Sequence, residues 1–182
     1  MAESASLRSL PQATSAMSAE PTLKTLDFLS GTTSASSRIT MNQWREDMKK
    51  RTHAFAVDVV RFVQGIPDRS DTRRLKDQLV GAASGADLNW HAACRGRTHK
   101  EFTSKLGVVL EEADEAAECL VVIRDSRIAT GDELVRLCQE GHELRLIFSK
   151  ATRTANENEE KARRMRKAGR QKSRRQERKA GE

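Results

Sequence analysis

The feature that most constrains this chain is the spacing of its apolar residues between positions 41 and 155. They recur at steps of three and four residues in four successive segments, which places them on one face of an α-helix in each segment. The four faces are Trp44, Met48, Phe55, Val59, Phe62 and Ile66; Leu75, Leu79, Ala82, Ala86, Trp90 and Ala93; Phe102, Leu106, Val109, Ala113, Ala116, Ala117 and Leu120; and Leu134, Leu137, Cys138, Gly141, Leu144 and Phe148. No strand-like alternation appears. We therefore expect an all-α protein, with residues 41–155 forming an antiparallel up-down four-helix bundle.

Residues that start and stop helices separate the four segments. The signals are Gly65 and Pro67 at the end of the first segment, Ser70 or Asp71 at the start of the second, Thr98 with Glu101 at the start of the third, and Thr130 with Glu133 at the start of the fourth. The connections are short, so consecutive helices are expected to be antiparallel neighbours.

The segments on either side of the bundle have very different compositions. Residues 1–40 are rich in Ser, Thr and Ala without a sustained period, which predicts disorder. Residues 156–182, the basic tail, carry eleven Lys and Arg from Lys161 onward against Glu177 and Glu182. That is a net charge of +9, so residues 1–160 carry −2 of the total of +7. This asymmetry points to a polyanionic partner. The pattern leaves open whether the fourth helix runs on into the tail.

The expected location is the cytoplasm. No apolar run approaches the roughly 18–20 residues that cross a bilayer, and the first residues lack the pattern of a signal peptide. The three cysteines, Cys94, Cys119 and Cys138, are odd in number and have no metal-binding spacing. They are expected to be free thiols in a reducing compartment.

The acidic run in the third segment is the strongest candidate for a metal site. A di-metal bundle needs inward carboxylates and Glu-x-x-His pairs, and no histidine of this chain follows a Glu at that spacing. At 100° per residue, Glu111, Asp114, Glu115 and Glu118 lie opposite the apolar face. They are predicted to be solvated, and no metal or cofactor is expected.

No constellation for covalent catalysis or phosphate transfer emerges either. His91 lies one helical turn before Cys94, but no third group is placed to orient the pair. Gly81 and Gly85 are not followed by the Gly-Lys-Ser/Thr of a phosphate loop. We expect the protein not to be an enzyme.

The basic tail is the candidate nucleic-acid site. It has no aromatic residue, so it can neutralise phosphates but cannot stack on bases, and weak sequence preference is expected. Its cationic residues are Lys161, Arg163, Arg164, Arg166, Lys167, Arg170, Lys172, Arg174, Arg175, Arg178 and Lys179. The alternative is a tail that only aids solubility. A second basic cluster, Arg95, Arg97 and Lys100 with His99, is either a ligand-facing edge or ordinary loop charge.

Three residues of the third segment fall outside its main apolar face. Val108, Cys119 and Val122 are predicted to face away from the core. They are either scattered surface residues or a contact between subunits or with a partner protein.

The run from Asn89 to Glu115 resembles a known family. Asn89-Trp90-His91-Ala92-Ala93, the basic turn Arg95-Gly96-Arg97, Glu101-Phe102 and Leu106-Gly107-Val108-Val109-Leu110-Glu111-Glu112-Ala113-Asp114-Glu115 are similar to the four-helix bundle proteins also called S23 or 23S-rRNA intervening-sequence proteins. Trp44, Gln78-Leu79 and Gly65–Pro67 match upstream. The resemblance implies a bacterial, non-enzymatic up-down helical bundle that often assembles into a ring, a homopentamer in some members. It also implies kinship with accessory proteins of diversity-generating retroelements, which associate with nucleic acid and reverse transcriptase, and it suggests a ribosomal component as another possible partner.

Two functions follow as hypotheses. The first is an oligomeric nucleic-acid-binding protein with RNA as the expected ligand, in which the bundle assembles copies and the tail contacts phosphates. The second is a protein–protein adaptor whose tail serves solubility.

Overall fold

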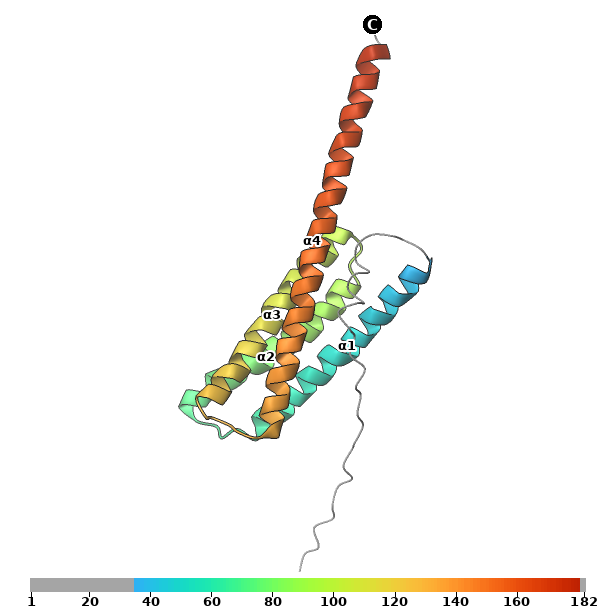
Figure 1. Cartoon of the computed structure of the whole chain (residues 1–182). Coiled ribbons are helices and arrows are strands. Elements are labelled where there is room, and N and C mark those ends of the chain that lie inside the picture. The colour runs from blue at the N-terminus through green and yellow to red at the C-terminus, as the bar shows by residue number, and fades with distance from the viewer. Residues whose placement is uncertain (1–34, 181–182) are drawn as a thin grey trace, which may run out of the picture.

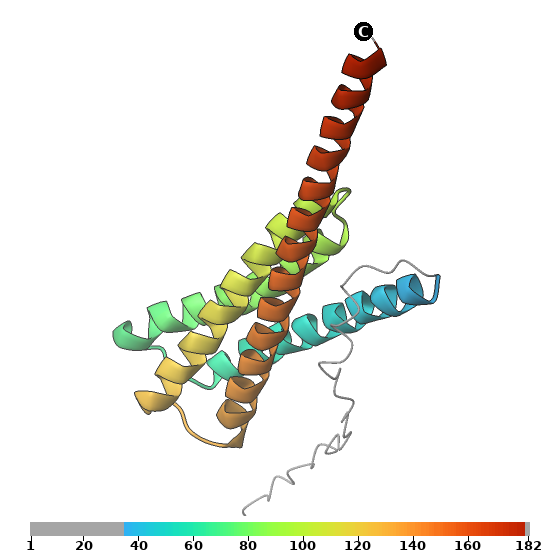
Figure 2. The same ribbon diagram turned by 45° about the horizontal axis from the view of Figure 1, so that its top comes forward.

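The computed structural model describes residues 35–180, with side chains described from Thr40 to Gln171. These residues form four helices, α1 (Ala35–Gln64), α2 (Ser70–Cys94), α3 (His99–Asp125) and α4 (Asp132–Ala180). Consecutive helices pack against each other and α1 also packs against α4, which closes an antiparallel four-helix bundle (Figures 1 and 2). The predicted fold class is confirmed. Within the described residues, no helix is both long and apolar enough to span a membrane.

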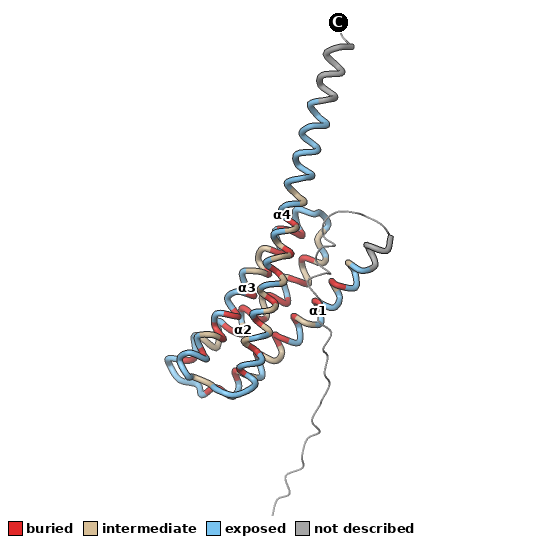
Figure 3. The backbone as a smooth tube through the Cα atoms, viewed as in Figure 1, coloured by how far each residue is buried: buried red, intermediate tan, exposed pale blue. Residues whose placement is uncertain are grey.

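The predicted apolar faces form a single core. Buried residues line the inner sides of the four helices along the bundle, whereas α4 is exposed where it leaves the bundle (Figure 3). The centre of one end is aromatic: the Trp90 ring lies 5.2 Å from that of Trp44, 5.4 Å from that of Phe148 and 6.3 Å from that of Phe102. Trp90 is fully buried, and its indole N–H donates to the carbonyl of Arg45 (3.3 Å). This cluster ties all four helices together at that end.

The helix boundaries differ from prediction at two starts. Helix α1 begins at Ala35, a few residues before the predicted boundary at 41, while the rest of the predicted disordered segment, residues 1–34, lies outside the described residues. The residue that caps α2 is Arg69, so Ser70 and Asp71 already lie inside the helix. There the Thr72 hydroxyl accepts from the Arg69 N–H (3.2 Å) and donates to the carbonyl of Pro67 (2.8 Å). Thr98 caps α3 as predicted, accepting from the Glu101 N–H (3.1 Å).

Charged side chains join the outer edges of helices. Arg51 on α1 donates to Glu140 (2.6 and 2.8 Å) and to Glu143 (2.5 Å), both on α4. The hydrogen bond to Glu140 raises the pKa of Arg51 further above its usual value. This half-buried clamp reinforces the α1–α4 contact.

Candidate nucleic-acid interface

Helix α4 does not stop at the bundle. Its last buried residues are Ala151 and Ala155, and it continues without a break to Ala180 (Figure 1). At about 1.5 Å per residue, the basic tail from position 156 to the helix end is roughly 37 Å long. Every residue from Lys161 to Gln171 is exposed. The question that the sequence left open is thereby answered, because the tail is a helical extension of the bundle.

The cations of the tail are not spread evenly around this helix. Six of the ten residues from Lys161 to Arg170 are Lys or Arg, and none is acidic. At 100° per residue, Ala162, Met165 and Gly169 share a sector of about 60° that contains no cation up to position 171. Met165 is 76% exposed. This neutral strip continues the line of Ala151 and Ala155, so the cations occupy the flanks and the far side of the tail. The side chains of Lys172, Arg174, Arg175, Arg178 and Lys179 lie outside the described part.

The second basic cluster lies at the base of the tail. Arg95, Arg97 and Lys100 are all exposed, in or beside the turn between α2 and α3. The next helix begins there, and the His99 Nε2–H donates to the carbonyl of Ala155 (3.1 Å), directly before the tail. The fold therefore brings together two basic segments that are about 60 positions apart in the sequence.

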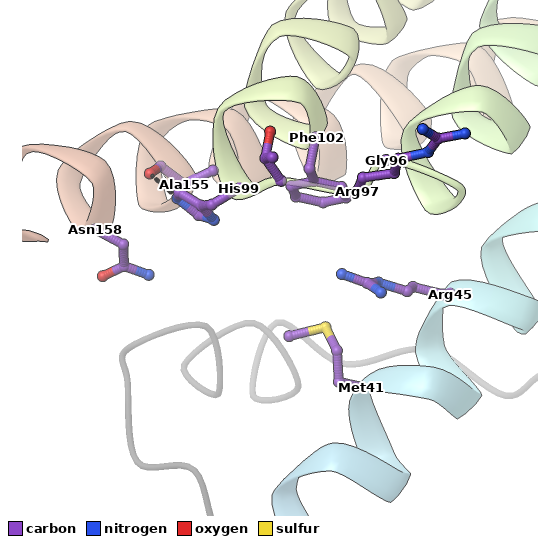
Figure 4. A pocket seen from close by; sticks show the side chains of 9 residues that line it. Met41, Arg45, Gly96, Arg97, His99, Phe102, Ala155 and Asn158 are labelled. Atoms are coloured by element: carbon purple, nitrogen blue, oxygen red, sulfur yellow. Dashed lines mark hydrogen bonds between the residues drawn. The ribbon is translucent and has the colours of Figure 1, made fainter.

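Between these segments and α1 lies a pocket of about 360 Å³ (Figure 4). Its described lining consists of Met41, Arg45, Gly96, Arg97, Thr98, His99, Phe102, Ala155 and Asn158. Arg45 was not predicted as a site residue. Its guanidinium carbon stands 5.1 Å from the centre of the Phe102 ring, a cation–π arrangement. No local pattern marks it, because Arg45 is a single cation beside a core tryptophan and the pocket joins three distant segments.

The three residues proposed for a subunit contact differ in exposure. Val122 is 45% exposed and Val108 is half-buried, but Cys119 is only 8% exposed and belongs to the core. The expectation that Cys119 faces away from the core is therefore wrong. Helix α3 packs against both α2 and α4, so its buried face is wider than one apolar stripe.

The acidic run of α3 is exposed, as predicted, and Cys94 is half-buried. Glu111, Asp114, Glu115 and Glu118 are exposed. Arg145 of α4 approaches Asp114 (3.2 Å) and Glu118 (3.4 Å), which are ordinary surface pairs. Burial raises the pKa of the Cys94 thiol, which disfavours the nucleophilic thiolate.

A buried carboxylate on α2 was missed by the sequence reasoning. Asp87 is 8% exposed and accepts a hydrogen bond from the buried Thr52 hydroxyl (2.8 Å). His53 Nδ1 lies 3.2 Å from one of its oxygens, and His91 Nε2 lies 3.6 Å from the other. These partners satisfy the buried charge and join α1 to α2. His91 therefore lies beside Asp87, whereas the sequence pattern pointed only to Cys94 as its neighbour.

Comparison with known proteins gives a likeness of fold. No family model matches this chain, and no curated protein matches it. Among solved structures, it is similar to a protein of unknown function from the S23 ribosomal protein family of Bacteroides thetaiotaomicron, with a TM-score of 0.54 and 16% identity. The match covers 97% of that chain and 60% of this one. At this identity the likeness supports the helical-bundle part of the family resemblance. The relation to retroelement accessory proteins stays a prediction.

Proposed function

We propose that this protein is a non-enzymatic nucleic-acid-binding protein whose basic tail contacts phosphates. The observation that carries the proposal is the exposed helical tail with six cations in ten residues, continuous with a bundle that presents Arg95, Arg97 and Lys100 at its base. Arg is well suited to this role because its guanidinium forms forked hydrogen bonds to phosphate oxygens. The S23 ribosomal name of the similar structure's family is the reason to test RNA first.

The contacts are expected to be electrostatic and weakly selective for sequence. The tail has no aromatic side chain to stack on bases, and Lys or Arg bound to phosphate reads no base identity. Assembly of several copies, as the family resemblance implies, would multiply weak tails through their effective concentration.

The test uses the full chain and two variants with equal loss of charge. The tail variant replaces four exposed arginines with Gln, which is almost as good a helix former. The control variant replaces four exposed cations of the bundle. The tail variant is Arg163→Gln, Arg164→Gln, Arg166→Gln and Arg170→Gln; the control is Lys50→Gln, Arg61→Gln, Arg73→Gln and Arg74→Gln.

Fluorescence anisotropy with a labelled single-stranded RNA at about 0.1 M salt provides the readout. Each phosphate contact to a single strand contributes about 0.7 to the slope of log K against log salt. If the unmodified chain and the tail variant bind equally at 1 M salt, the loss of four contacts weakens binding at 0.1 M salt by up to about 2.8 log units, on the order of 600-fold. The control variant is expected to bind within about 3-fold of the unmodified chain. Equal losses in the two variants would mean that net charge matters and the tail does not.

A protein–protein adaptor is the second candidate, favoured by large apolar side chains in solvent. Leu88 is 67% exposed, Val135 60% and Leu146 53%. They lie on α2 and α4, outside the basic tail. An adaptor would bind its partner with little dependence on salt and would keep that binding in the tail variant.

A further inference from the structure

The pocket at the base of the tail has the charge of an anion site. Arg45 and Arg97 line it together with His99, and none of the described lining residues carries a carboxylate. The ion pairs found among the described side chains involve neither Arg45 nor Arg97. The nearest acid in the turn, Glu101, accepts a hydrogen bond from the Arg97 backbone N–H (3.0 Å) beside the pocket. Its negative charge opposes an anion, but it lies outside the lining.

Among the described residues, Arg45 is held by ring and backbone contacts, and none of the side-chain hydrogen bonds among them uses its guanidinium. The Phe102 ring supports the guanidinium, and the Trp90 indole fixes the backbone carbonyl of the same residue. Its Nε atom is buried and has no hydrogen-bond acceptor within the described residues. An unsatisfied buried donor is unfavourable, and a donor of a charged group more so. Figure 4 shows the Arg45 side chain extending from α1 toward the space between Met41 and Arg97. An anionic oxygen there would satisfy it.

Neutral donors surround the same space. The Thr98 hydroxyl accepts from the Glu101 N–H, which leaves its own hydrogen able to donate. Thr98 also caps the start of α3, and the partial positive charge of that 27-residue helix favours an anion at this end. The Asn158 amide lines the opposite side of the pocket, on α4. The pocket lining thus includes two arginines and a threonine whose hydroxyl can donate.

We propose that this pocket binds a phosphate monoester, either the terminal phosphate of a polynucleotide or the phosphate of a free nucleotide. A monoester presents three oxygens and close to two negative charges, and it can enter end-on against the Arg45 guanidinium in a pocket that Arg97 also lines. An internal diester has fewer free oxygens and a chain that leaves in two directions. The volume of about 360 Å³ leaves room beyond the phosphate itself, in the range of small-ligand sites. The polynucleotide source rests on the proposed function, whereas the free-nucleotide source does not.

The test compares two RNA oligonucleotides of one sequence, one with a 5′-phosphate and one with a 5′-hydroxyl, on the full chain. The unmodified protein is expected to prefer the phosphorylated oligonucleotide by about 10-fold or more. Arg45→Met and Arg97→Gln should each reduce this preference to the small difference in affinity that the extra negative charge of the 5′-phosphate causes by itself. Arg61→Gln, on the same helix as Arg45 but about 24 Å away along it, removes one charge elsewhere and should leave the preference intact.

The tail variant separates this inference from the proposed function. It is expected to weaken both oligonucleotides equally and to keep their ratio. Competition by adenosine monophosphate that abolishes the preference would assign the site to free nucleotides, and its failure to compete would assign it to polynucleotide ends. Circular dichroism checks the fold of Arg45→Met, and Arg97→Gln lies on an exposed turn where folding is not at risk. Equal binding of both oligonucleotides together with no binding of the nucleotide would overturn the inference. So would a preference that survives both substitutions.

Discussion

Replacing Gly169 tests whether the tail acts as a helix, because the change alters backbone preference without altering charge. The residue lies in the neutral strip, and a Cβ added there would meet nothing within 4 Å. Every residue from Lys161 to Gln171 is exposed, and no described segment packs on this part of the tail, so its helix depends on intrinsic propensity. Alanine at this position gains about 1 kcal/mol of helix free energy, and proline loses about 2 kcal/mol relative to glycine. Proline also clashes with the carbonyl of Met165.

These energies convert into affinity if the tail binds as a helix. Gly169→Ala should tighten RNA binding by up to about 5-fold, since less of the binding free energy is used to order the tail. Gly169→Pro should weaken it by up to about 30-fold, because six of the eleven tail cations follow the break. The assays are anisotropy for affinity and circular dichroism at 222 nm for helix content. Identical affinities in three proteins whose helix content differs would refute the reasoning and indicate a tail that binds as a flexible polycation.

Three further predictions concern the bundle. Gly81→Ala should raise the free energy of unfolding by about 0.8–1 kcal/mol, because alanine is the better helix former and the added methyl meets nothing within 4 Å. Calorimetry should show a Tm higher by a few degrees, and a lower Tm would contradict the described packing of α2. Burial raises the pKa of the Glu112 carboxyl, with a contribution from Glu115. The charged carboxylate therefore lowers the stability of the folded state above the folded-state pKa, and this effect is absent below the unfolded-state pKa. Glu112→Gln should therefore stabilise the bundle at pH 7 by about 0.2–0.5 kcal/mol in urea titrations, with the gain disappearing toward pH 4, and a gain independent of pH would contradict this. Val122→Glu should shift an oligomer toward monomer in light scattering if the exposed face of α3 joins subunits, and an unmodified chain that is already monomeric would exclude that contact.

The helices and their core could be predicted from the sequence because each helix of a bundle buries one regular face. Trp90 and Phe148 follow that pattern and are fully buried. Cys119 is buried although it lies outside the predicted apolar face of its helix. Because α3 packs against both α2 and α4, one apolar face underestimates how much of the helix is buried. The end of α4 could not be predicted from the sequence, because the helix propensity of the tail residues favours a longer helix and the repulsion among their charges opposes it.

The site was only partly predictable for a different reason. The tail and the Arg95–Lys100 turn are visible as runs of charge, but their proximity depends on the antiparallel path of α4. Arg45 and the pocket arise where α1, the α2–α3 turn and α4 meet, and no local pattern marks such a junction. Asp87 is a single acid in an alanine-rich stripe, and two of the partners that satisfy it, Thr52 and His53, lie across the helix interface on α1.

The most direct test of the central claim is the salt dependence of RNA binding by the full chain and by the tail variant with four arginines replaced. About five phosphate contacts by the tail on a single strand predict a slope of log K against log salt near −3.5, and the tail variant should reduce its magnitude by up to about 2.8. The control variant should keep the slope of the unmodified chain. Parallel slopes for the unmodified chain and the tail variant would show that the basic tail does not carry the phosphate contacts.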